Sequence, residues 1–127
     1  MLFFQSNNFK KYSDLELIEH YKKTTNNKYI GELFNRYTIF VLGISLKYFK
    51  DEDKSKDATM QIFEKLLVDL MDHSIQNFRP WLHQVTRNFC LMELRKEQSL
   101  LKKTIELEHS NSTFMESSSS ILSLIHI

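Results

Sequence analysis

The 127-residue sequence has few residues that interrupt helices, with two glycines and one proline in the whole chain. Positions for tight turns are therefore scarce, and long helices are expected. The sequence predicts an all-α fold, a compact bundle of about four helices. Hydrophobic residues make up 42% of the chain and aromatic residues 13%, which is enough to bury a core and excludes disorder of the whole chain.

Cysteine is nearly absent as well. The single Cys90 excludes an intramolecular disulfide, so an oxidising compartment is not indicated. Because it stands between two apolar residues, we interpret it as a packed side chain rather than a reactive thiol. No stretch approaches the roughly 20 apolar residues of a membrane span, and the first eight residues lack the features of a signal peptide. We therefore expect no membrane insertion and a cytoplasmic location.

Motifs for catalysis and metal binding are also missing. The chain has no glycine-rich phosphate loop and no nucleophile elbow, and its five histidines lack the paired spacing of a metal site. His73 and His83 flank one predicted loop, and we interpret both as surface histidines. We expect no catalytic residue, no metal and no cofactor, and therefore a protein that acts by binding rather than as an enzyme.

Two helices are predicted in the N-terminal half. Ser13 and Glu16 have the spacing of a capping box, which places the start of the first helix at Ser13. The second is expected over residues 28–49, where apolar residues recur at intervals of three and four. On this helix we expect Arg36 to face outward and Gly43 to permit a close crossing of another helix.

Two further helices are predicted in the C-terminal half. One covers residues 56–72, with Asp53 or Ser55 as its N-cap. The other has Pro80 in its first turn and continues for about four turns to Lys96. Its apolar residues share one face that must be buried. They are Trp81, Leu82, Val85, Phe89 and Met92.

Charge is distributed unevenly, although the net charge is only +1. Residues 50–74 contain four lysines and seven acidic residues, whereas residues 79–103 contain six cations and two acidic residues. An acidic segment and a basic segment in one small protein suggest two different partners.

The composition also suggests where the domain ends. Residues 1–12 are expected to form a leader, residues 13–103 the helical domain and residues 104–127 a linker and tail, because polar and small residues dominate after Lys103. The apolar stretch over residues 121–127 is too short for a membrane helix.

Four consecutive segments resemble the second conserved region of the extracytoplasmic-function (ECF) group of bacterial RNA polymerase sigma factors. These segments are Ser13–Ile18, Leu33–Tyr37, Asp57–Leu66 and Phe78–Lys96. The last of them is similar to the form found in Bacteroidetes-type members. Each segment alone is a weak signal, whereas their order and spacing together are specific.

The resemblance implies a transcription initiation factor with two binding surfaces. The third predicted helix would bind the clamp coiled coil of the largest subunit of core RNA polymerase, through Asp57, Gln61, Phe63, Glu64 and Leu67. The fourth helix and the loop before it would recognise and melt the minus-ten promoter element and hold its non-template strand. The residues implied for DNA are Asn77, Phe78, Arg79, Gln84, Arg87, Asn88, Arg95 and Lys96. An anti-sigma factor would be a further partner.

The sequence departs from the family pattern in two respects. Many members have glutamine at the position of Met60 and an acidic residue at the position of Gln61. A complete ECF factor also continues into a helix-turn-helix domain for the minus-thirty-five element, the region 4 domain, which this sequence lacks, so we expect the promoter-melting half alone.

One alternative remains open. In this alternative, the chain is a helical protein-interaction module, a decoy or regulator of a sigma factor or polymerase, without DNA binding. The basic fourth helix favours DNA binding, because a pure interaction module does not need it.

Overall fold

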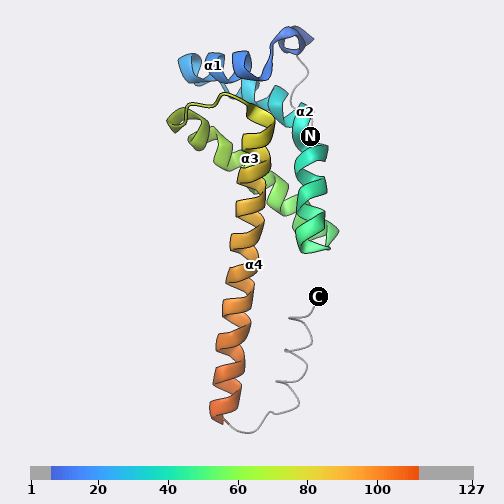
Figure 1. Ribbon diagram of the computed structural model, residues 1–127, viewed down its shortest axis with the longest axis vertical. Coiled ribbons are helices and arrows are strands. Elements are labelled where there is room, and N and C mark those ends of the chain that lie inside the picture. Colours follow the sequence, from blue (N-terminus) through green and yellow to red (C-terminus); the bar gives the residue numbers. More distant parts are fainter. Residues whose placement is uncertain (1–6, 112–127) are drawn as a thin grey trace. The chain divides into compact units, whose positions relative to one another are not determined.

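The computed structural model describes residues 7–111, and within this range the chain is helical (Figure 1). A short 3₁₀ helix, η1 (Asn7–Lys11), is followed by α1 (Asp14–Thr24), α2 (Asn27–Phe49), α3 (Glu52–Asp72) and α4 (Phe78–Asn111). The predicted all-α fold with four α-helices is confirmed.

The chain divides into two compact units, Met1–Cys90 and Leu91–Ile127, and the boundary falls within α4. Each unit is described by itself. α4 continues to Asn111, so residues 104–111 of the expected linker are helical. Residues 1–6 of the expected leader and residues 112–127 of the expected tail lie outside the described residues.

Side-chain caps determine where α1 and α2 begin. The backbone N–H of Ser13 donates to Glu16 Oε1 at 2.8 Å, and Ser13 Oγ accepts from the backbone N–H of Glu16 at 3.1 Å. This is the predicted capping box, in which two otherwise unpaired N–H groups are satisfied. α2 begins after Asn26, whose Oδ1 accepts from the backbone N–H of Lys28 at 3.0 Å.

α3 begins at Glu52, earlier than predicted, because Asp51 is its N-cap. Asp51 Oδ1 accepts from the backbone N–H groups of Asp53 and Lys54. The prediction of Asp53 or Ser55 as the cap is therefore wrong. Ser55 lies inside the helix and is fully buried.

The core of the first unit is formed by α1, α2, α3 and the beginning of α4. α2 and α3 pack along one another, and α1 contacts both of them (Figure 1). The core consists of Leu17, Ile18, Tyr21, Ile30, Leu33, Val41, Ile62, Phe63, Leu66, Leu70, Phe78 and Leu82. Burial of these apolar side chains is the main force that holds the helices together.

The buried face of α4 differs by part of a turn from the predicted face. In the first unit its buried residues recur every fourth position: Phe78, Leu82, Thr86 and Cys90. Thr86 is tolerated there because its Oγ1 donates to the carbonyl oxygen of Leu82 at 2.8 Å. Trp81, Val85 and Phe89 pack half-buried beside the core, whereas Met92, in the second unit, is 49% exposed.

Gly43 lies exposed in α2, and a Cβ added to it would meet no atom within 4 Å. The expectation that Gly43 permits a close helix crossing is therefore wrong.

We expect Gly43→Ala to raise the free energy of unfolding by about 0.5–1 kcal/mol, the cost of glycine in a helix interior. The backbone of Gly43 has no positive φ, so alanine adopts the same conformation. Urea unfolding followed by circular dichroism measures the change, and a decrease in stability would contradict the expectation.

Candidate interaction surfaces

A half-buried polar network at Arg36 fixes the start of α1 to α2. Arg36 Nη1 lies 2.9 Å from Asp14 Oδ1, and Arg36 Nε lies 2.9 Å from Glu32 Oε2. Arg36 Nη2 also donates to the backbone carbonyl oxygens of residues 9, 10 and 12, and the Tyr37 hydroxyl donates to Asp14 Oδ2. The prediction that Arg36 faces outward is wrong, and this residue holds the fold together.

The network also changes the acidity of its members. Burial lowers the pKa of Arg36, but hydrogen bonds and charges from Asp14 and Glu32 outweigh burial and raise the pKa overall. Burial, followed by the hydrogen bond to Asp14, raises the pKa of Tyr37. Arg36 is therefore firmly cationic and already satisfied by this chain, which makes it a structural residue rather than a ligand contact.

Exposed polar residues of α3 form an acidic face, which we define as Asp57, Gln61 and Glu64. They recur at intervals of three and four, so they lie on one side of the helix. Gln61 Nε2 donates to Asp57 Oδ2 at 2.6 Å. Phe63 and Leu67, which the sequence grouped with them, are buried and half-buried, respectively. They are therefore not part of the exposed face.

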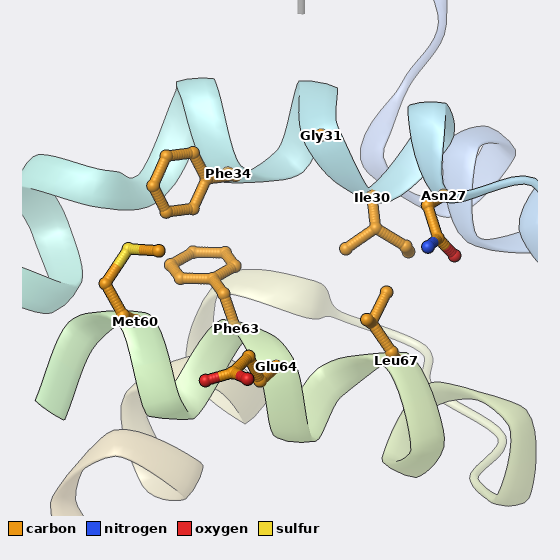
Figure 2. Close-up of a pocket in the computed structure, with 8 residues that line it drawn as sticks. All are labelled: Asn27, Ile30, Gly31, Phe34, Met60, Phe63, Glu64 and Leu67. Atoms are coloured by element: carbon orange, nitrogen blue, oxygen red, sulfur yellow. The ribbon is translucent and has the colours of Figure 1, made fainter. Parts of the chain in front are cut away.

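Phe63 and Leu67 instead line an apolar groove of about 190 Å³ between α2 and α3 (Figure 2). The groove is lined by Asn27, Ile30, Gly31 and Phe34 of α2 and by Met60, Phe63, Glu64 and Leu67 of α3. The rings of Phe34 and Phe63 meet edge to face, with centroids 4.8 Å apart. Glu64 belongs to both the groove and the acidic face. The groove therefore suits an apolar side chain of a partner, and the carboxylate of Glu64 at its border suits a partner that is positively charged.

Exposed polar residues of α4 in the first unit form a basic face, which we define as Arg79, His83, Gln84, Arg87 and Asn88. Gln84 Nε2 donates to Asn88 Oδ1 at 3.3 Å, which links the two amides. Within residues 7–111, neither Arg79 nor Arg87 forms an ion pair. Asn77 is exposed immediately before the helix. The face can therefore meet an anionic partner without first breaking an internal pair.

The two remaining predicted cations, Arg95 and Lys96, lie in the second unit, and both are exposed. Lys96 Nζ is 3.3 Å from Glu93 Oε2, on the same helix. An exposed pair of this kind is worth at most about 1 kcal/mol, so it does not prevent Lys96 from binding an anion.

The sequence predicted that Phe78 lies in an exposed loop that reads bases, and the structure places it elsewhere. Phe78 is the first residue of α4 and only 3% exposed. The centroid of its ring lies 5.2 Å from that of Tyr37 and 6.0 Å from that of Trp81. This ring is therefore part of the core, and we do not retain it as a DNA contact.

The part of the chain that the structure describes contains no group of three or more His, Cys, Asp or Glu side chains arranged for a metal ion. In the same range, no helix combines the length and the apolar character needed to cross a membrane.

A comparison with protein-family models matched residues 33–100 to the model of sigma-70 region 2. These residues are more than half of the 127-residue chain. They include the acidic face of α3 and the basic face of α4. Comparisons with curated proteins and with solved structures found no match.

Proposed function

Because the chain belongs to the sigma-70 family through a region 2 domain, we propose that it is a transcription initiation factor domain that binds core RNA polymerase and melts the minus-ten promoter element. One observation supports this proposal above all others. The matched segment carries an exposed acidic face on α3, which borders the apolar groove between α2 and α3, and an exposed basic face on α4. Two surfaces of opposite charge suit a protein partner and a polyanion.

The finer assignments are also proposals. The resemblance of the four sequence segments supports the ECF type, and the fourth segment supports a Bacteroidetes-type member. We also propose a cytoplasmic location. An anti-sigma factor is proposed as a further partner of the same domain. Neither an enzymatic reaction nor a cofactor is part of the proposal.

We assign the acidic face and the groove to the clamp coiled coil of the largest polymerase subunit. Asp57, Gln61 and Glu64 are exposed and provide polar contacts. Phe63 and Leu67 act from within the groove, where they would contact an apolar side chain of the coiled coil. This division between polar rim and apolar floor is typical of protein interfaces.

We expect the double variant Asp57→Lys/Glu64→Lys to bind bacterial core RNA polymerase at least about tenfold more weakly, because like charges across an interface cost several kcal/mol. Titration of the fluorescently labelled protein with core polymerase measures the affinity.

The matched control is Glu19→Lys/Glu106→Lys, which makes the same change of charge at exposed positions on α1 and α4. The control should bind like the parent protein. If the two double variants bind equally well, the assignment of the acidic face is wrong.

We assign the basic face of α4 to the non-template strand. Arg79 and Arg87 would neutralise phosphates, and the amides of Gln84 and Asn88 would hydrogen-bond to base edges. Asn77, Arg95 and Lys96 are proposed as additional contacts, since all three are exposed. The binding energy of these contacts must offset the cost of unpairing and unstacking the bases, a few kcal/mol.

A further inference from the structure

Arg79, in the first turn of α4, rests on aromatic rings of α2. Its Cζ lies 4.2 Å from the centroid of the Phe40 ring and 6.0 Å from that of Tyr37. Both distances are within the range of about 6 Å over which a cation is attracted to a ring face. Tyr37 and Phe40 themselves pack edge to face, with centroids 5.9 Å apart and an interplanar angle of 73°. The ring beneath Arg79 is therefore held in place by its neighbour.

The guanidinium of Arg79 keeps a face and an edge available for a ligand. The residue is exposed, and its side chain makes no hydrogen bond or ion pair with any residue of the described range. A planar group that lies over one ring has an opposite face on which a second planar group can stack. Its N–H groups lie along its edge, where they can donate to a phosphate.

A second planar group lies beside this arrangement. His83 follows Arg79 by one turn of α4, is exposed, and has its ring centroid 6.1 Å from that of Phe40. The surface at the junction of α2 and α4 thus presents Arg79 over the ring of Phe40, and His83 beside that ring at an interplanar angle of 54°. A phosphate contact alone needs no aromatic support, whereas recognition of an unstacked base uses planar groups of this kind.

We propose that Arg79, supported by Phe40, is a stacking platform for one unpaired nucleobase of the melted strand, with the guanidinium edge on the adjacent phosphate. This inference rests on the proposed function and gives the basic face a base-binding subsite. Phe40 is a positioning residue, because its ring holds the guanidinium in place before DNA arrives. Less side-chain freedom then remains to be lost on binding.

The test compares two single-stranded probes of equal length and charge, one with a mixed base sequence and one with abasic sites throughout. Fluorescence anisotropy at low salt gives the affinity of the 127-residue chain for each probe. We expect the parent protein to prefer the base-containing strand. Arg79→Lys keeps the charge and removes the planar group, so it should reduce this preference by about fivefold or more and leave the affinity for the abasic strand unchanged.

Arg87→Lys is the matched control, because it makes the same change on the same helix at a residue that we assign to a phosphate and that contacts no aromatic ring within the described residues. It should keep the full preference for bases. Phe40→Leu should reduce the preference as Arg79→Lys does, and the double variant should show no further reduction. Because Arg79 is exposed, its substitution is not expected to impair folding, so the result does not depend on the stability of the Phe40 variant.

Three outcomes would overturn the proposal. If Arg79→Lys keeps the preference for bases, the platform is wrong although the proposed function stands. If Arg79→Lys weakens binding to both probes equally, Arg79 is a phosphate contact only. If the parent protein binds neither probe, both the platform and the DNA-binding part of the proposed function are refuted.

Discussion

Replacing Arg36 by methionine should lower the free energy of unfolding by about 2–3 kcal/mol, near the lower end of the cost of breaking a buried ion pair. Methionine keeps the apolar stem and removes every donor. The carboxylates of Asp14 and Glu32 then lose their cation, and three backbone carbonyl oxygens lose a donor. The lower end applies because the side chain of Arg36 is still 23% exposed.

Lys56→Met provides a matched control for this measurement. Lys56 also pairs with a glutamate one turn earlier, at 3.0 Å from Glu52, but both side chains are more than half exposed. Solvent screens such a pair, so its loss should change stability much less. Urea unfolding of both variants measures how much each substitution lowers the free energy of unfolding. If Arg36→Met costs no more than Lys56→Met, the network does not hold α1 on α2.

Replacing Arg87 and Asn88 together by alanine should weaken binding to a single-stranded minus-ten oligonucleotide by about 100-fold. One base contact, worth about 1–3 kcal/mol, is lost together with one phosphate contact. Loss of the Arg87 charge should also make the affinity less dependent on salt, by about 0.7 in the logarithmic slope for a single strand. Fluorescence anisotropy at several salt concentrations measures both effects.

Gln98→Ala/Lys102→Ala is the control for this variant, since it removes one amide and one cation from exposed positions of the same helix. It should bind like the parent protein. If the Arg87/Asn88 variant also binds like the parent, the chain is better described as a helical protein-interaction module that does not contact DNA.

The existence and type of the four helices could be predicted from the sequence because apolar residues recur with the period of a helix in each of them. The start of α1 could be predicted because Ser13 and Glu16 satisfy each other's N–H groups locally. The start of α3 could not, since Asp51, Asp53 and Ser55 can all act as caps. The choice among them depends on which residue has an extended backbone, and here it is Asp51.

The role of Arg36 depends on contacts that the sequence does not make visible. A charged residue beside an apolar stripe normally faces solvent. Here Asp14, on a different helix, draws the guanidinium inward. The spacing of Glu32 and Arg36, one turn apart, was the available signal.

The candidate surfaces were predicted in part. The composition located the acidic and basic segments, and the structure confirms that Asp57, Gln61, Glu64, Arg87 and Asn88 are exposed. The composition could not locate the groove, because the groove forms only where Ile30 and Phe34 of α2 lie opposite α3. Phe78 was misjudged because a residue at the end of a loop can turn either way, and packing on Tyr37 decides its direction.

The most direct test of the central claim is anisotropy of a labelled non-template minus-ten oligonucleotide titrated with the chain, with and without core RNA polymerase. The two-surface account predicts that Asp57→Lys/Glu64→Lys loses the gain in affinity that polymerase provides and keeps the intrinsic binding to the oligonucleotide. It predicts that Arg87→Ala/Asn88→Ala loses oligonucleotide binding and still associates with polymerase. If each variant lost both activities, or if neither lost any, separate surfaces for polymerase and for the melted strand would be contradicted.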